Sequence, residues 1–381
     1  YFVLHVLYAA TLIYLPQVND PHSFFYLMLL AMCFYMPTLA LSNSISYTAL
    51  TEGKYDLVKA FPPIRVWGTI GFITAMVLVN LTGNKATSMQ FYIAGAAAIA
   101  LSIFSFTLPK CPPRNANNTN KTLAQTLGLE AFKLFGNYKM ALFFLFSMLL
   151  GGALQLTNAY GDVFIDEFKY YPKYVDSIVI KYSTIILSIS QISETLFILA
   201  IPFFLRRFGI KQVMLISMFA WVLRFALFAY GDPTNGLWMI ILSCIVYGMA
   251  FDFFNISGSL FVETSTDNHI RSSAQGLFMM MTNGFGAVLG SLISGWAIDR
   301  FFTNSFSNVD SLAQYLQTDA TNTHLQSFLQ GRGVTVAQNG LLSADIFMKD
   351  WHTIWLSFAL YTLVIAILFA FLFKHKHTRV E

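Results

Sequence analysis

The chain has 381 residues, of which 56% are hydrophobic and only 11% are charged. Because ordinary soluble domains carry about 25% charged residues, this composition excludes a soluble protein and indicates an integral membrane protein. The formal net charge of +4 says little by itself. Cys33, Cys111 and Cys244 are far apart in the sequence, so their spacing predicts neither a disulfide framework nor a metal site.

Long apolar runs predict the membrane-spanning helices. A helix needs about 20 predominantly apolar residues to cross the hydrocarbon core, and we count about ten such runs. They lie near residues 1–16, 24–47, 63–82, 89–109, 140–160, 180–205, 212–230, 237–259, 276–298 and 352–373. The sequence therefore predicts an all-α membrane protein.

A polar stretch at residues 110–139, rich in Pro, Asn and Lys, interrupts the apolar runs and predicts a linker. Before it, residues 1–109 hold four predicted spans, and after it residues 140–381 hold six. Two pseudo-symmetric six-helix bundles joined by a cytoplasmic linker are the major facilitator architecture. We predict this fold, and we expect the first two helices of the N-terminal bundle to be missing from these 381 residues.

Lysine and arginine gather in alternate loops, and this pattern predicts the orientation. Cytoplasmic loops of membrane proteins carry an excess of these residues. The basic loops include the linker, residues 206–211 and the tail after residue 373. We therefore predict that the linker and the C-terminus are cytoplasmic.

A second polar segment, residues 301–350, lies on the predicted external side. It is longer than an ordinary loop, so we expect either a partly helical cap or a disordered flap. The spacing of Leu312, Leu316, His324, Leu325 and Phe328 suggests an amphipathic helix. The simplest interpretation is a surface decoration, and the pattern assigns it no role.

Gly284, Gly286, Gly290 and Gly295 fall in one predicted span. Small residues let helix backbones approach each other closely in a membrane. We therefore predict that these glycines serve helix packing.

Two carboxylates lie inside apolar runs, Glu194 in residues 180–205 and Asp252 in residues 237–259. A charge near the bilayer centre costs about 2.5 to 3.5 kcal/mol on insertion scales, so each is a candidate functional residue. Gln191 precedes Glu194 by one helical turn, and Tyr247 and Phe251 precede Asp252. These spacings can bring the groups to a shared helix face. They predict a polar, aromatic-lined pocket of the kind that holds a solute in a transporter.

Arg65, Thr69 and Phe72 lie at positions i, i+4 and i+7, so one helix stripe carries a cation, a hydroxyl and a ring. The alternative for Arg65 is an arginine that extends to the cytoplasmic surface. Gln155 and Asn158, at i and i+3, can form an amide pair. The alternative for this pair is an interhelical clamp.

Arg224 is a cation in the middle of the predicted span at residues 212–230. It could neutralise Asp252 or Glu194, or extend to the membrane surface. The local sequence does not decide between these roles. We leave Arg224 outside the predicted site.

The sequence offers no phosphate-binding loop, metal-ligand cluster or nucleophile constellation in a supporting context. We therefore expect neither an enzyme nor an ATP-driven pump, and no bound metal. No cofactor is expected either. Ion-coupled or passive transport remains as the favoured function class.

Several long strings resemble the bacterial nucleoside:proton symporters, a major facilitator family that includes nucleoside and xanthosine permeases. They occur in family order over nearly the whole chain. The strings are YMPTLALSNSISY at 35–47, FPPIRVWGTIGF at 61–72, SISQISETLFILAIPFFLRRFGIK at 188–211, RFALFAYGDPT at 224–234, YGMAFDFFNISGSLFVE at 247–263 and MMTNGFG at 280–286. The resemblance implies a nucleoside site at matching positions. These are Arg65, Thr69, Phe72, Gln155, Asn158, Gln191, Glu194, Tyr247, Phe251 and Asp252.

The sequence thus predicts proton-coupled import of purine or pyrimidine nucleosides across the bacterial inner membrane by alternating access. Either Glu194 or Asp252 is a candidate carrier of the coupled proton, because a desolvated carboxylate is more easily protonated. Expected partners are nucleosides, protons and membrane lipid, with no nucleic acid, and the expected state is a monomer. Two alternatives stay open: a sugar or oligosaccharide:proton symporter, and a membrane receptor that binds a solute without transporting it.

Overall fold

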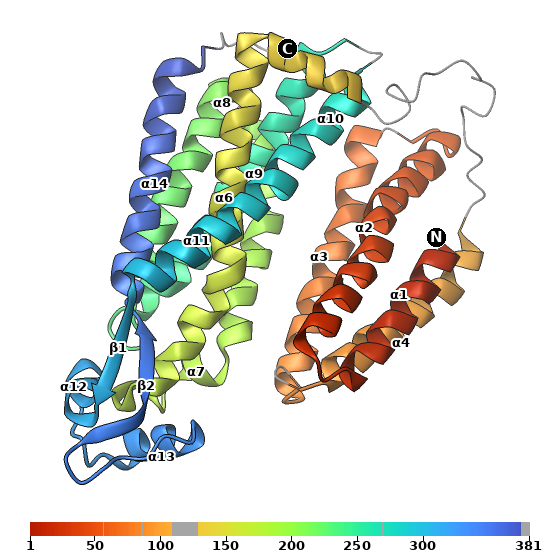
Figure 1. Cartoon of the computed structure of the whole chain (residues 1–381). Coiled ribbons are helices and arrows are strands. Elements are labelled where there is room, and N and C mark those ends of the chain that lie inside the picture. Colours follow the sequence, from red (N-terminus) through yellow and green to blue (C-terminus); the bar gives the residue numbers. More distant parts are fainter. Residues whose placement is uncertain (56, 85–86, 109–128, 268–269, 375–381) are drawn as a thin grey trace. The chain divides into compact units, whose positions relative to one another are not determined.

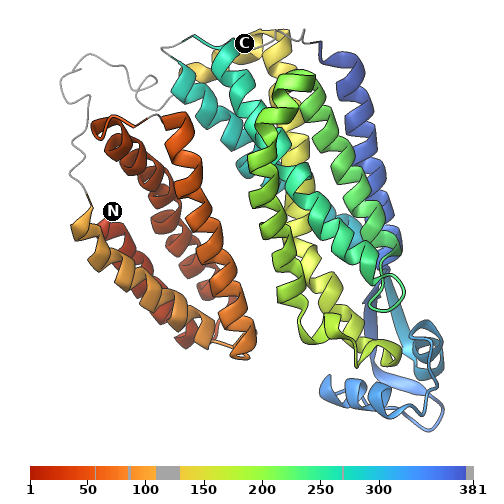
Figure 2. The same cartoon turned by 180° about the vertical axis from the view of Figure 1, so that it is seen from behind.

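The computed structural model describes residues 1–55, 57–84, 87–108, 129–267 and 270–374. The chain forms two compact units, Tyr1–Asn120 and Lys121–Glu381, both built from long helices (Figures 1 and 2). In the described ranges, every predicted apolar run lies on a helix. Most of the predicted linker, residues 110–128, lies outside the described residues.

The first unit is a group of four long helices. They are α1 (Phe2–Tyr14), α2 (Pro21–Glu52), α3 (Leu57–Leu81) and α4 (Met89–Phe104), with the short 3-10 turns η1 (Leu15–Gln17) and η2 (Ser105–Thr107). The helix α1 packs on both α2 and α4. At Gly95 of α4, an added Cβ would lie 2.8 Å from the side chain of Ile13, so this glycine lets α4 approach α1.

The second unit contains six long apolar segments in its described part. They are α6 (Tyr138–Glu167), the two halves of α8 (Ser183–Tyr230), α9 (Leu237–Ser265), the continuous stretch of α10 (Arg271–Met279), η6 (Met280–Gly286) and α11 (Ala287–Phe301), and α14 (Trp351–Leu372). Shorter turns flank α6, namely η3 (Leu129–Gly136), η4 (Phe168–Tyr170), η5 (Pro172–Tyr174) and α7 (Ile178–Lys181). A stretch long and apolar enough to cross a membrane occurs in α6, in α8 taken as a whole, in α9, in the α10–η6–α11 segment and in α14.

Gly209 divides α8 into the two spans that the sequence predicts. Its backbone angles are φ 77° and ψ 168°, a region that residues with a Cβ rarely adopt. The helix therefore turns back on itself at this residue. Next to the turn, Lys211 Nζ donates to the carbonyl of Ala370 at 2.9 Å, which brings the turn beside the end of α14.

Glycines allow α6 to pack directly on η6 and α11. An added Cβ on Gly290 would lie 2.6 Å from the Cα of Gly152, and one on Gly151 would lie 2.0 Å from the carbonyl oxygen of Thr282. An added Cβ on Gly286 would lie 2.4 Å from the carbonyl oxygen of Met148. The packing prediction is therefore confirmed for Gly286 and Gly290, and the sequence pattern missed their partners on α6.

Gly284 and Gly295 do not take part in this packing. An added Cβ on Gly284 would meet only the Met280 side chain, at 3.5 Å, and one on Gly295 only the hydroxyl of Tyr160, at 3.7 Å. Both distances are ordinary van der Waals contacts. For these two glycines the packing prediction is wrong, because their free faces do not point at a helix backbone.

Residues 303–349 fold into a small subdomain at the end of the second unit opposite to the Gly209 turn (Figure 1). An antiparallel pair, β1 (Thr303–Asn308) and β2 (Leu341–Lys349), encloses α12 (Val309–Tyr315) and α13 (Thr323–Gly331). Leu312, Leu316 and Leu325 form its core. The amphipathic pattern thus marks two short helices rather than one, and the strands were not predicted.

The subdomain is attached to the ends of α6 and α14. Trp351 Nε1 donates to Glu167 at 2.7 Å, and Lys349 pairs with the same carboxylate at 3.5 Å. Lys173 donates to Gln317 at 2.7 Å. A polar network therefore fixes residues 303–349 to the helical bundle.

We predict that Gly290→Ala lowers the thermal stability of the protein. The added methyl group must push α11 away from the Gly152 backbone, and overpacking of this kind costs about 1 to 3 kcal/mol. The measurement is the unfolding midpoint of the purified protein in detergent. Gly284→Ala is the matched control, because its methyl group has room. Equal midpoints for the two variants would contradict the packing seen here.

Candidate functional site

The polar centre of the second unit begins at a close contact between α8 and α9, the most extensively paired helices (Figure 2). An added Cβ on Gly248 would lie 2.5 Å from the backbone carbon of Ser193 and 2.6 Å from the backbone nitrogen of Glu194. The Ser193 hydroxyl donates to the carbonyl of Ile245 across the same contact. The lack of a side chain at position 248 therefore brings Glu194 next to α9.

Tyr247 is the centre of an aromatic cluster at this contact. Its ring is buried and lies parallel to that of Phe251, with centroids 5.8 Å apart and 1° between the planes. Trp221 of α8 meets Tyr247 edge-on, at 5.9 Å and 87°. The i, i+4 aromatic pair predicted on α9 is thus an ordered stack, held from the side by an indole.

Both membrane carboxylates lie near the same tyrosine. The backbone of Glu194 lies beside Gly248, which follows Tyr247 on α9, and Asp252 comes one helical turn after Gly248. Asp252 is only 5% exposed, whereas Glu194 is half-buried. The structure therefore brings together Glu194, Tyr247, Phe251 and Asp252, which are four of the predicted site residues.

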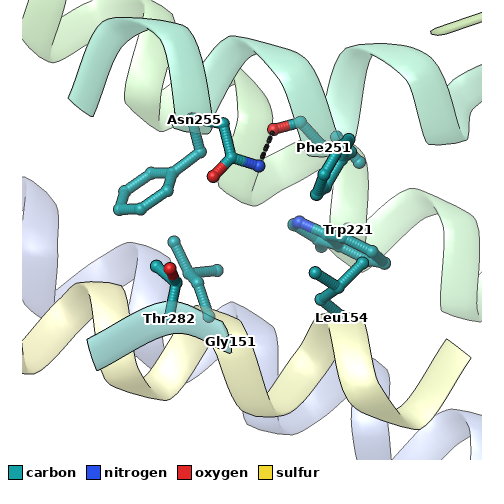
Figure 3. Close-up of a pocket in the computed structure, with 9 residues that line it drawn as sticks. Gly151, Leu154, Trp221, Phe251, Asn255 and Thr282 are labelled. Atoms are coloured by element: carbon teal, nitrogen blue, oxygen red, sulfur yellow. Dashed lines mark hydrogen bonds between the residues drawn. The ribbon is translucent and has the colours of Figure 1, made fainter. Parts of the chain in front are cut away.

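A narrow cleft runs between α6, α8, α9 and η6 beside this cluster (Figure 3). Its walls include Gly151, Trp221, Phe251, Asn255 and Thr282. Asn255 Nδ2 donates to the carbonyl of Phe251 at 3.1 Å, so the amide is held against the same helix. The cleft has a volume of about 20 Å³, enough for about one water molecule and too small for an organic solute.

The predicted amides lie on partly or fully exposed faces of α6 and α8. Gln155 is half-buried and lies one turn after Gly151, which lines the cleft. Gln191 is half-buried one turn before Glu194, and Asn158 is exposed. Within the second unit, the predicted site is thus an open polar face next to aromatic rings, not an enclosed cavity.

Three predicted site residues belong to α3 of the first unit. Thr69 is half-buried and Phe72 is 54% exposed, and they lie one turn apart on the helix. The side chain of Arg65 lies outside the described residues, although its backbone belongs to α3. Thr69 and Phe72 therefore share a face of α3 that is at least partly open.

A family model for the nucleoside H⁺ symporter matches residues 1–378. The chain belongs to the nucleoside H⁺ symporter family. It is 48% identical to the xanthosine permease of Escherichia coli K12 over 378 residues, which cover 99% of this chain and 80% of the relative. It is 47% identical to the nucleoside permease NupG of the same organism, over all of this chain and 81% of the relative.

A solved structure extends this likeness to three dimensions. The structure of a point mutant of the nucleoside transporter NupG superposes on this nucleoside H⁺ symporter family member with a TM-score of 0.80 and 45% identity. The match covers 98% of this chain and 82% of that one. The predicted family and the all-α major facilitator fold are both confirmed.

The sequence analysis missed several residues of this symporter's polar centre. Trp221, Asn255 and Thr282 all line the cleft, and Arg224 contacts the Tyr247 ring at 4.6 Å. Signals for two of them were present: Asn255 follows Phe251 by one turn, and Arg224 is a mid-span cation. The sequence did not mark Trp221 as a site residue, because aromatic residues are common in apolar spans.

A larger groove lies between α6, α11 and α14 of the symporter. Its volume is about 390 Å³, and its walls include Gly152, Gly290, Ile293 and Phe358. This lining is almost wholly apolar, with a few hydroxyl groups from residues such as Tyr361. A nucleoside needs many hydrogen-bonding partners, so the open polar face beside the cleft is the better candidate although the groove has more enclosed space.

Proposed function

We propose that this chain is a proton-coupled transporter that imports purine or pyrimidine nucleosides by alternating access. The observation that carries the proposal is the placement of two carboxylates, Glu194 and Asp252, at the α8–α9 contact that also carries the stacked rings of Tyr247 and Phe251. The names of the relatives, a xanthosine permease and a nucleoside permease, support the same substrate class.

The rings supply a stacking surface for the nucleobase. Phe251 forms part of the cleft wall and is half-buried, so one part of its surface is open to a ligand. Stacking of a base on an aromatic side chain contributes about 1 to 3 kcal/mol in nucleic-acid binders. Because Phe251 stacks on Tyr247, which is itself held by Trp221, little ordering is needed when the base binds.

Polar groups at the edge of the rings match the rest of a nucleoside. The amides of Gln155, Asn158 and Gln191 offer donors and acceptors for base edges or ribose hydroxyls. Ionised carboxylates accept hydrogen bonds from a ribose diol. The family resemblance adds Arg65, Thr69 and Phe72 of α3 to this set, and we propose that they also contact the nucleoside.

Proton coupling is assigned to the same two carboxylates, with different roles. Glu194 is half-buried, so it can exchange a proton with water, which a carrier must do on each side of the membrane. Asp252 is almost fully buried and directly follows Phe251, so we propose that it contacts the bound ribose. Glu194 is then the principal proton carrier.

The cellular setting follows from family and charge. We propose a monomer in the bacterial inner membrane with a cytoplasmic C-terminus. Lys139 lies 5.2 Å from the ring of Phe261, which packs on Phe373 at 5.3 Å, and Lys211 bonds to Ala370. These basic residues therefore lie at one end of the second unit, and the subdomain of residues 303–349 lies at the other (Figure 1).

The test of the function is uptake of radiolabelled uridine, adenosine and xanthosine by cells that lack other nucleoside permeases and express the complete gene. We expect at least one nucleoside to accumulate, and a protonophore to abolish the accumulation. A labelled disaccharide is the control for the sugar symporter. Disaccharide uptake without nucleoside uptake would refute the proposal. Nucleoside accumulation that is unchanged by the protonophore would refute proton coupling.

The division of roles between the carboxylates predicts two different defects. Glu194→Gln keeps hydrogen-bonding capacity but removes a titratable proton, so accumulation should fall at least tenfold while nucleoside affinity stays within about threefold of the parent. Asp252→Asn should weaken binding itself, by about tenfold. Calorimetric titration of the purified proteins, alongside uptake, measures both. Normal accumulation by Glu194→Gln, or parental affinity in Asp252→Asn, would contradict the division.

The orientation is tested with two reporter fusions. Green fluorescent protein fused after Glu381 should fluoresce, because it folds in the cytoplasm. Alkaline phosphatase inserted after Asn339, in the loop before β2, should be active, because it needs the oxidising external side. Alkaline phosphatase after Glu381 is the control and should be inactive. The reverse pattern would overturn the positive-inside assignment.

A further inference from the structure

Arg224 is a fully buried cation in the middle of a membrane-spanning helix. Its side chain is 1% exposed and is among the largest buried side chains of the described residues. A charged group in this setting is expensive, and apolar residues of similar size often replace buried charges without loss of stability. Packing alone therefore does not explain an arginine at this position.

Reciprocal hydrogen bonds hold Arg224 to α9. Its Nη1 donates to the carbonyl of Ser243 at 2.6 Å, and the Ser243 hydroxyl donates back to the carbonyl of Arg224 at 3.0 Å. Among the described residues, no hydrogen-bond partner is found for Nε. The guanidinium is thus fixed at one end by a backbone carbonyl while much of its plane is left for other contacts.

Those other contacts include two aromatic rings. The guanidinium carbon lies 4.6 Å from the ring centre of Tyr247 and 4.9 Å from that of Phe228. Tyr247 in turn lies parallel to Phe251, which forms the cleft wall. A cation, a tyrosine and a phenylalanine therefore follow one another from the interior of the helix pair to the predicted nucleoside surface.

We propose that Arg224 is a positioning residue for nucleoside binding, which it serves by fixing the ring of Tyr247 and, through it, the ring plane of Phe251. Arg224 does not contact the nucleoside. Its cation attracts the ring face of Tyr247, and the planar guanidinium favours one ring orientation. The inference rests on the proposed function, because it assigns the arginine to the same binding surface.

The experiment compares nucleoside binding and transport in the protein expressed from its complete gene. Arg224→Met keeps most of the volume and removes the charge. We expect it to raise the dissociation constant and KM about tenfold, with the maximal rate per folded molecule within about twofold of the parent. Arg224→Lys keeps the charge without the planar group, so we expect an increase of about threefold. Arg300→Met is the matched control, since Arg300 is exposed on α11, and its affinity should equal that of the parent.

A double-mutant cycle separates positioning from a merely structural role. In a Tyr247→Leu background the ring that Arg224 acts on is gone, so adding Arg224→Met should change affinity less than twofold. If Arg224→Met weakens nucleoside affinity by the same factor with and without Tyr247, the two residues act independently and the inference is overturned. Parental affinity in Arg224→Met would also overturn it. If Arg224→Met fails to fold, Arg224→Lys decides, and parental affinity in that variant would overturn the inference as well.

Nucleoside binding by the parent protein distinguishes a failure of this inference from a failure of the proposed function. If the parent binds nucleoside and the Arg224 variants bind it with the same affinity, the positioning role is refuted and the proposed function stands. No binding by the parent refutes the proposed function and the inference together.

Discussion

The pairing of α8 with α9 is the constraint on which the rest of the second unit depends. A bilayer offers no water to polar groups, so each must find a partner inside the protein. Along this pair, Ser193 and Ser217 of α8 donate to the carbonyls of Ile245 and Ala250 of α9. Gly248 lets the backbones meet between them. These short polar links stabilise the pair.

The polar centre follows from that pairing. Because α8 turns back at Gly209, its two halves both contact α9, and each contributes to the surroundings of Tyr247. The first half carries Glu194, and the second half carries Trp221 and Arg224. One helix turn-back thus brings a carboxylate, an indole and a guanidinium to a single tyrosine. A glycine with a positive φ and a glycine without room for a methyl group are therefore as important to the site as its charged residues.

Much of this was predictable from the sequence, for a physical reason. Apolar runs of membrane length give the helices, because the bilayer fixes the length of a span. An isolated carboxylate in such a run marks a candidate site, because its burial is costly, and Glu194 lies beside Gly248 of α9, the helix that carries Asp252. Which helices pack against each other was harder to predict from the sequence. The contact of Gly151 and Gly152 with Thr282 and Gly290 depends on which helix faces which, and one sequence does not encode that in a readable pattern.

The missed elements share a cause. Arg224 has two plausible environments, the membrane surface and a ring-lined interior, and only tertiary contacts distinguish them. The strands β1 and β2 pair across an insertion of more than thirty residues, a non-local contact that the local sequence does not announce. Secondary-structure propensity and hydrophobic periodicity do not predict contacts of this kind, because such contacts depend on the tertiary structure.

The central claim is that the nucleoside binds at the aromatic and carboxylate cluster of α8 and α9. The most direct test is an experimental structure of the protein with a bound nucleoside. The account predicts a base stacked on Phe251, with a ribose hydroxyl or base edge within about 3 Å of Asp252 or Glu194. Density for the nucleoside in the apolar groove lined by Gly152, Gly290 and Tyr361, with the cluster empty, would contradict it.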